Sequence, residues 1–385
     1  MHPAASLDPL GLTAREFILA ARASGVREPQ AIDAYRRVYR DGVAEAPPAR
    51  ARIAPVVRRL EEPTPEGLSI KFVQRLPGRE RVTPSGDNAG MPYLDIESVI
   101  IPMVGRRAAR SHTLCVSSQV GCAMGCVFCE TAQMGLVRSL TPGEIVGQWW
   151  SATHVERARV KNIVFMGMGE PLENLDNVLG AIEILTDHNG AGVPMANIQV
   201  STSGRPEAIR RLAASMRRPG WHKLGLAVSI NAPNDEIRSR LMPINRASPM
   251  RELREALLDV PHLGTHKKIC FAYVLIPGQN DDLAHADELA AYLEPFTARS
   301  GTDGRTRGMV NLIPYNPRRG SPWEAPTPER VAAFHDRLRA RGVYVKLRRT
   351  KGRDSMAACG QLGTEEIRKR RFVGLRVEHG ARAEA

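Results

Sequence analysis

The sequence lacks long apolar runs. None approaches the roughly 20 consecutive apolar residues that a membrane-spanning helix needs, which argues against an integral membrane protein of the helical kind. The first residues, MHPAA, also lack the charged start and apolar stretch of a secretory signal. We therefore expect a cytoplasmic protein without a membrane partner.

Acidic residues are also few relative to basic ones. The 385 residues contain 54 Lys and Arg against 41 Asp and Glu, a formal net charge of +13. This excess favours a polyanionic partner such as nucleic acid, because phosphates bound by Lys and Arg release counterions. A basic surface that contacts only solvent would have the same composition, so charge alone does not decide between the two. The basic residues crowd near the end of the chain, at 318–319, 348–353 and 368–371.

Cysteine is scarce, but its distribution is uneven. Four of the six cysteines fall within the fifteen positions from Cys115 to Cys129. In a cytoplasmic chain such clustering indicates metal or redox chemistry, because structural disulfides are rare there. Residues 121–129 read GCAMGCVFC, which places Cys122, Cys126 and Cys129 at CxxxCxxC spacing on one short loop.

This spacing predicts a [4Fe–4S] cluster. Three thiolates can each bind one iron of a cubane and leave the fourth iron without a protein ligand, whereas ferredoxin-type clusters use four cysteines. The alternative is a zinc site. Zinc would require a fourth ligand nearby, and neither a histidine nor a fourth cysteine follows the loop at zinc spacing.

The order of strand-like and helix-like segments indicates an α/β fold. Apolar residues at helical spacing predict a helical region over 8–60, and strands are expected at 68–73 and 96–102. From residue 112 onward, runs rich in Val and Ile alternate with helical stretches, which is typical of βα units and a parallel sheet. The expected strands are 113–116, 162–166, 198–201, 224–230, 269–275, 310–313 and 343–347, and the expected helices are 141–157, 174–188, 205–216, 249–258, 281–294 and 327–341. This pattern fits a barrel, full or partial, or an open doubly wound sheet, and both bind ligands at the carboxyl ends of the strands.

Polar residues follow three of these strands, where a ligand would bind. MGMGEP at 166–171 combines glycines, which permit close backbone approach, with Glu170, whose carboxylate can receive an ammonium group. STSG at 201–204 and SINAP at 229–233 also end apolar strands. Each alone could be a turn or a helix N-cap. Because these segments follow a CxxxCxxC loop by one βα unit or more, they indicate the wall of an S-adenosylmethionine (SAM) site.

Three cysteines lie outside the loop. Cys115 precedes it by seven residues, and Cys359 stands beside Gly360 in a polar, basic segment that favours the thiolate. A lone cysteine is more often buried and inert than catalytic, so the residues by themselves leave both roles open. Cys270 lies in a strand pattern, and we expect it in the core.

Taken together, these segments resemble the RlmN/Cfr family of radical SAM RNA methyltransferases. The resemblance rests on TLCVSSQVGC at 113–122, GMGEP at 167–171, SINAPNDEIR at 229–238, NLIPYNP at 311–317 and ACGQL at 358–362. It implies a partial (βα)6 TIM-like barrel with a small N-terminal helical domain. The expected parts are an RNA-binding accessory domain at 1–65, a strand-rich extension at 66–110, the barrel at 111–350, and a C-terminal segment at 351–385 that carries Cys359 and a basic tail.

The resemblance also implies residue roles. The cluster on the three loop cysteines binds one SAM and cleaves it reductively to a radical, while another SAM methylates Cys359, so that two SAM are used per turnover. The radical activates the methyl group of this S-methylcysteine for addition to the adenine. Glu97 accepts the ring proton, and Cys115 forms a transient disulfide with Cys359 that releases the product. The implied SAM contacts are Gly169, Glu170, Ser201, Ser229, Ile230, Asn231 and Asn316.

The implied substrate is RNA. RlmN-like members methylate carbon 2 of an adenosine in the peptidyl-transferase centre of 23S rRNA, and some also treat the adenosine 3′ of the tRNA anticodon. Cfr-like members methylate carbon 8 of the same rRNA adenosine and confer antibiotic resistance. We expect carbon 2, because it is the commoner housekeeping role. We also expect a monomer that receives electrons from a flavodoxin- or ferredoxin-type reductant.

Two other classes of protein are compatible with parts of the pattern. A radical SAM enzyme acting on a small molecule or peptide would leave Cys115 and Cys359 without a role. An Fe–S redox-sensing RNA-binding protein would not need the GEP and Asn316 elements. The chain also departs from the family pattern: Asn231 stands where many members carry His, Glu130 stands where a small residue is usual, and the N-terminal region lacks the usual aromatic-rich helices. These departures bear on substrate choice.

Overall fold

A single sheet dominates the computed structural model, which describes residues 6–79, 91–105, 110–261, 268–298, 306–318, 320–348 and 360–363. Its strand order is β14-β13-β12-β11-β10-β9-β6-β5-β4-β3. The strands from β14 to β6 are parallel to one another. Their bounds are Arg110–Cys115 for β6, Val160–Phe165 for β9, Ile198–Thr202 for β10, Gly225–Ser229 for β11, Ile269–Leu275 for β12, Gly308–Pro314 for β13 and Val345–Leu347 for β14. These strands confirm the predicted parallel sheet.

Three antiparallel strands extend the sheet beyond β6. They are β5 (Met91–Val104), β4 (Gly67–Arg79) and β3 (Val56–Thr64). The strands predicted at 68–73 and 96–102 are therefore confirmed. The predicted helical region over 8–60 is wrong beyond Arg40, because residues 56–64 form the edge strand of the sheet and 45–46 and 49–50 form the short strands β1 and β2. An edge strand needs only one hydrogen-bonded neighbour, and β4 provides it.

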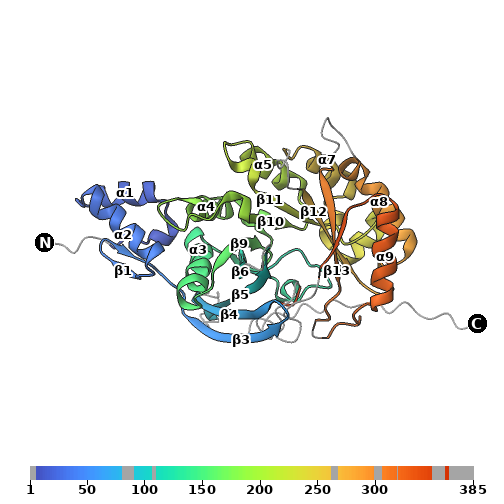
Figure 1. Ribbon diagram of the computed structural model, residues 1–385, viewed down its shortest axis with the longest axis horizontal. Coiled ribbons are helices and arrows are strands. Elements are labelled where there is room, and N and C mark those ends of the chain that lie inside the picture. The colour runs from blue at the N-terminus through green and yellow to red at the C-terminus, as the bar shows by residue number, and fades with distance from the viewer. Residues whose placement is uncertain are drawn as a thin grey trace, which may run out of the picture.

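Helices follow the parallel strands and cover one side of the curved sheet (Figure 1). Their bounds are Pro142–Trp150 for α3, Leu175–Thr186 for α4, Pro206–Met216 for α5, Asp235–Leu241 for α6, Met250–Leu258 for α7, Leu283–Thr297 for α8 and Pro328–Ala340 for α9. The sequence signals the start of α3 clearly, since Thr141 and Glu144 form a capping box around Pro142. Helix α6 was not predicted. The arrangement confirms a partial TIM-like barrel, and no helix in the described ranges is long and apolar enough to cross a membrane.

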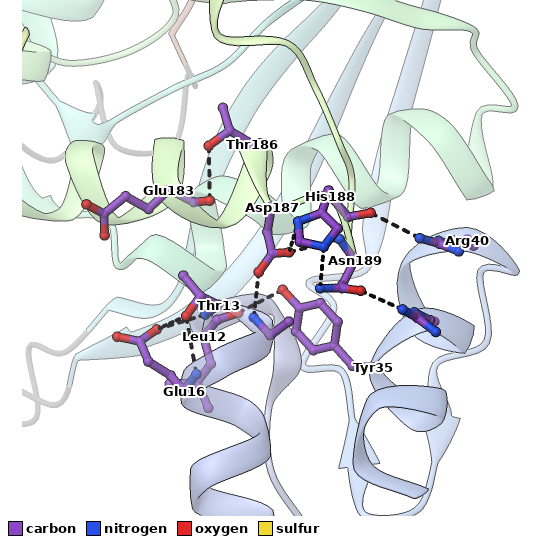
Figure 2. A network of polar contacts seen from close by, with 12 residues as sticks. Leu12, Thr13, Glu16, Tyr35, Arg40, Glu183, Thr186, Asp187, His188 and Asn189 are labelled. Atoms are coloured by element: carbon purple, nitrogen blue, oxygen red, sulfur yellow. Dashed lines mark hydrogen bonds and ion pairs between the residues drawn. The ribbon is translucent and has the colours of Figure 1, made fainter. Parts of the chain in front are cut away.

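The N-terminal helices α1 (Ala14–Ala23) and α2 (Glu28–Arg40) are fixed to the barrel. Asp187, which follows α4 and is labelled in Figure 2, accepts a hydrogen bond from Ala14 N at the start of α1 (2.7 Å). Arg40 donates to the carbonyl of His188 (3.0 Å) in the same turn. On the other side, the ring of Tyr39 packs against Trp149 of α3, with centroids 6.0 Å apart. The division of the chain at 65, 110 and 350 stays a prediction.

Candidate active site

The three clustered cysteines lie on a loop between β7 (Gln119–Gly121) and the short helix Thr131–Met134, beyond the carboxyl end of β6. The loop begins at Gly121, which has a φ of +76°, and a Cβ there would collide with the carbonyl oxygen of Gly135. Its middle is tied to the barrel. Val127 N donates to Leu241 O (3.0 Å), and Arg318 Nε donates to Val127 O (3.0 Å). The fold therefore holds this loop at the end of the sheet where ligands bind.

All three cysteines line one cavity, together with the polar residues at the carboxyl ends of the strands. The pKa of the Cys122 thiol is raised to about 12, mainly by burial and in part by the nearby Cys129. Burial likewise raises the pKa of Cys126 and Cys129. A thiolate at these positions therefore needs a positively charged partner, which iron would supply.

The donor set fits a cubane cluster. In the described ranges no group of three or more His, Cys, Asp or Glu is arranged to hold a single metal ion. The thiolates of a cubane bind three different irons, so their sulfurs are spread around the cluster and do not converge on one point. Cys122, Cys126 and Cys129 are the residues that would hold the cluster, and three thiolates would leave one of its four irons without a protein ligand.

Glu170 forms part of the same cavity wall. Its Oε2 accepts hydrogen bonds from Ser203 N and Ser203 Oγ, both at 2.7 Å, and its Oε1 accepts one from Leu172 N at 3.1 Å. Burial raises the pKa of this carboxyl, although the bonds from Ser203 oppose the rise. A cationic ligand group beside Glu170 would favour the ionised form in the same way, as expected for the ammonium of SAM.

Six of the seven SAM contacts implied by the resemblance line this cavity together with the cysteines: Gly169, Glu170, Ser201, Ser229, Asn231 and Asn316. The seventh, Ile230, is fully buried beside them. Gly169 has a φ of +102°, and a Cβ there would lie 2.6 Å from the side chain of Gln119. Only glycine permits this approach.

The departure at Asn231 has a conformational basis. Asn231 has a φ of +55°, a region that Asn and His enter more readily than most residues. Its Oδ1 accepts a hydrogen bond from Val274 N (2.8 Å), and its carbonyl accepts one from Asn280 Nδ2 (2.8 Å). Asn231 therefore ties the end of β11 to β12 beside the cavity.

Arg238, the last residue of SINAPNDEIR, is a residue of the site for which no role was predicted. Its side chain on α6 is fully buried. It donates to the carbonyls of Ser203, Ser229 and Ile230, at 2.5, 3.1 and 3.1 Å, and to Asn245 Oδ1 at 2.8 Å. Burial lowers the pKa of this guanidinium. Arg238 thus joins the carboxyl ends of β10 and β11, which carry Ser201 and Ser229.

We expect Arg238→Met to reduce the free energy of unfolding by about 3 kcal/mol or more, because several buried acceptors lose their donor. Arg240 lies one position from the end of the same helix and is exposed, so Arg240→Met should change stability by no more than about 0.5 kcal/mol. Urea unfolding of both variants beside the natural chain provides the measurement. Equal stabilities for the two variants would contradict this role of Arg238.

Glu97 and Cys115 lie on neighbouring strands. Cys115 on β6 is directly opposite Val99 on β5, and Glu97 is two residues from Val99, so all three side chains share one face of the sheet. Ser98 points to the other face and donates to Gln148 of α3 (2.7 Å). Both Glu97 and Cys115 are buried.

Cys359 lies outside the described residues, but residues 360–363 lie against the site. Gly363 N donates to Glu97 Oε2 (3.0 Å), and Gly360, which lines the cavity, accepts from Glu130 N (2.7 Å). Two further bonds fix this segment: Thr131 Oγ1 to Leu362 O (2.6 Å) and Gln361 Nε2 to Pro317 O (2.9 Å). Glu130, the unusual residue after the loop, is buried against this segment.

Cys270 and Arg348 also line the cavity. Cys270 is buried, as predicted, but it faces the interior of the barrel and not the helices. Burial raises its pKa to about 11. The alternation of small and large residues in ICFAYVL at 269–275 could have indicated this orientation. The small residues Cys270 and Ala272 face the cavity, and the large residues Phe271 and Tyr273 pack against helices.

Known proteins are similar to this chain over most of its length. Residues 116–290 match the radical SAM superfamily. A protein from Protochlamydia amoebophila named "Probable dual-specificity RNA methyltransferase RlmN 1" is 46% identical over 281 residues, covering 73% of each chain. The "Dual-specificity RNA methyltransferase RlmN" of Nitratidesulfovibrio vulgaris is 38% identical over 331 residues, covering 83% of this chain and 86% of the relative.

A solved structure shares the fold. The crystal structure of a radical SAM methyltransferase from Sphaerobacter thermophilus superposes with a TM-score of 0.76 at 35% identity, covering 92% of this chain and 98% of that one. Since this likeness extends far beyond residues 116–290, it includes the sheet extension as well as the barrel.

Proposed function

We propose that this chain, which belongs to the RlmN family of radical SAM RNA methyltransferases, methylates carbon 2 of an adenosine in the peptidyl-transferase centre of 23S rRNA. We extend the proposal to the adenosine 3′ of the tRNA anticodon, since the relatives are named dual-specificity enzymes. As a radical SAM enzyme the chain uses a [4Fe–4S] cluster and SAM. The net charge of +13 is consistent with an RNA substrate.

One observation carries the proposal. The cavity that holds the three cysteines and the polar strand ends also contains Gly360, the residue after Cys359. The same segment contacts Glu97 through Gly363. A generic radical SAM site would need only the cysteines and the strand ends. A bound C-terminal segment beside a buried carboxylate supports a reaction in which Cys359 and Glu97 take part.

When bound, the cluster supplies the electron that cleaves SAM, which gives the radical needed because an aromatic C–H carbon is too poor a nucleophile for direct methyl transfer. We assign the protein's own part to three residues. The Cys359 thiolate takes a methyl group from one SAM. The radical from a second SAM would remove one hydrogen atom from this group, and the remaining methylene would add to the adenine carbon, so each turnover uses two SAM. The adduct would return one electron to the cluster, and Glu97 removes the ring proton. The Cys115 thiolate then attacks the Cys359 sulfur: an S–S bond forms, the S–C bond breaks, and its electron pair returns to the carbon, which takes up a proton to become the methyl group.

Nucleoside mass spectrometry of rRNA and tRNA, from cells with and without the gene, tests the proposal. We expect 2-methyladenosine in both RNAs only when the gene is present. Detection of 8-methyladenosine would show that the enzyme methylates carbon 8 and not carbon 2. If the gene alters methyladenosine in neither RNA, these RNAs are not the substrate. If methyladenosine changes in rRNA alone, tRNA is not a substrate. A monomeric state, cytoplasmic location and a flavodoxin- or ferredoxin-type reductant stay predictions.

A further inference from the structure

A buried lysine lies beside Glu97. Lys71 on β4 has only 5% of its surface exposed, and its Nζ is 3.5 Å from Glu97 Oε2. Lys71 is directly opposite Val99, which is directly opposite Cys115 on the next strand. Paired residues of antiparallel strands point to the same face, so Lys71, Glu97 and Cys115 share the face that turns away from α3. The mechanism described above leaves Lys71 without a role.

We propose that Lys71 is a positioning residue for the proton transfer, which keeps Glu97 ionised and turns one of its carboxylate oxygens towards the substrate side. This inference rests on the proposed function, in which Glu97 takes the ring proton. It concerns how Glu97 is prepared for that step and how it is reset afterwards.

The hydrogen bonds of Glu97 are asymmetric. Oε2 receives both Lys71 Nζ at 3.5 Å and Gly363 N at 3.0 Å. In the described part of the chain, Oε1 accepts no hydrogen bond from protein. Lys71 and the segment after Cys359 therefore hold the same oxygen. This leaves Oε1 available as the proton acceptor and fixes its position relative to the segment that carries Cys359.

The charge of Lys71 offsets part of the free-energy cost of burying the Glu97 carboxylate. Burial raises the pKa of Glu97, and the charges that oppose this rise are Lys71 on β4, first, and Arg58 on β3, together with the bond from Gly363 N. A general base must be ionised before it can act. Once Glu97 has taken the ring proton it is neutral beside a buried ammonium. Lys71 then favours release of that proton, because it stabilises the carboxylate, and Glu97 returns to its starting state.

Lys71→Met tests the inference, because methionine keeps the length of the side chain and removes its charge. In single-turnover reactions with an RNA substrate we expect cluster content and 5′-deoxyadenosine formation to stay at the natural level. Formation of methyladenosine at pH 7 should slow by about 10-fold or more, a part of the roughly 10²–10⁴-fold that a positioned base contributes, while a covalent protein–RNA adduct accumulates. Without Lys71 the pKa of Glu97 rises further, so the rate should recover as the pH is raised towards 9.

Matched variants separate this role from a structural one. Lys71→Arg keeps the charge and should restore the rate at pH 7 to within a few-fold. Ser69→Ala changes a buried polar residue two positions earlier on the same strand and should leave the pH profile unchanged. If Lys71→Met does not fold, Lys71→Gln carries the same expectation.

The outcomes also separate this inference from the proposed function. A Lys71→Met enzyme with natural product formation and pH profile would overturn the role of Lys71, as would loss of the cluster or of SAM cleavage without an adduct. Glu97→Gln should stall at the adduct at every pH, since a carboxamide cannot accept the proton. If Glu97→Gln turns over normally, the assignment of Glu97 as the base fails, and the role of Lys71 fails with it. If Glu97→Gln stalls and Lys71→Met does not, the assignment of Glu97 as the base is kept and Lys71 has only a structural role.

Discussion

Cys126→Ala is expected to abolish both the brown iron–sulfur chromophore and SAM cleavage. The natural chain, purified anaerobically, should bind about four irons, as expected for a cubane on three thiolates. The remaining two cysteines cannot hold that cluster, and Cys126 lies in the cavity wall with the other two. Because every radical SAM reaction begins with electron transfer from the cluster, the loss of activity should be complete.

Cys270→Ala is the matched control for this experiment. Cys270 lines the same cavity but lies on β12 and not on the loop, so this variant should keep its iron. Iron content, absorbance and 5′-deoxyadenosine formation are measured side by side. A natural chain that holds one stoichiometric zinc, or a Cys126→Ala chain that retains four irons, would contradict the cluster.

The two cysteines outside the loop are expected to give opposite phenotypes. Cys359→Ala should form no RNA adduct and no methylated product, because no thiolate is present to receive the methyl group. Cys115→Ala should complete every step before resolution and then accumulate a covalent protein–RNA species. This species should appear as a shifted band on a denaturing gel and disappear on nuclease treatment. The asymmetry follows from the proposed order of the steps, in which Cys115 acts only in the final thiol exchange.

The geometry required for this exchange is demanding. The two sulfurs must come into contact, with Cα atoms within about 7 Å, although 244 positions separate them (359 − 115). The contact of Gly363 with Glu97, two positions along β5 from the partner of Cys115, is consistent with this approach. Normal turnover by Cys115→Ala would refute its assignment.

The N-terminal helices α1 and α2 are held to the barrel on two sides. The rings of Phe17, Tyr35 and Tyr39 pack in series and continue onto Trp149 of α3. On the other side, the hydrogen bond from Ala14 N to Asp187 attaches the start of α1 to the turn after α4. The helices are therefore held in a set orientation relative to the barrel; that they contact RNA stays a prediction.

The sequence by itself predicted an iron–sulfur cluster and determined the class of the fold. CxxxCxxC is a local pattern, because three ligands of one cluster can come from a loop of eight residues. Val- and Ile-rich strands and the capping box at Thr141 are also local, since the strand preference and the helix start depend on neighbouring residues. These signals predicted the parallel sheet, most helices and the carboxyl-end site.

Only the tertiary structure decided which distant residues meet there. Strand β3 was read as helical because an edge strand is stabilised by its neighbour β4, which the local pattern does not reveal. Arg238 reaches Ser203, Lys71 reaches Glu97, and Glu97 reaches Gly363 across 266 positions. Such contacts depend on the register of the whole sheet and on the path of the C-terminal segment. A buried Lys or Arg has no local signature, because its partners are set by the packing of elements that are far apart in the chain.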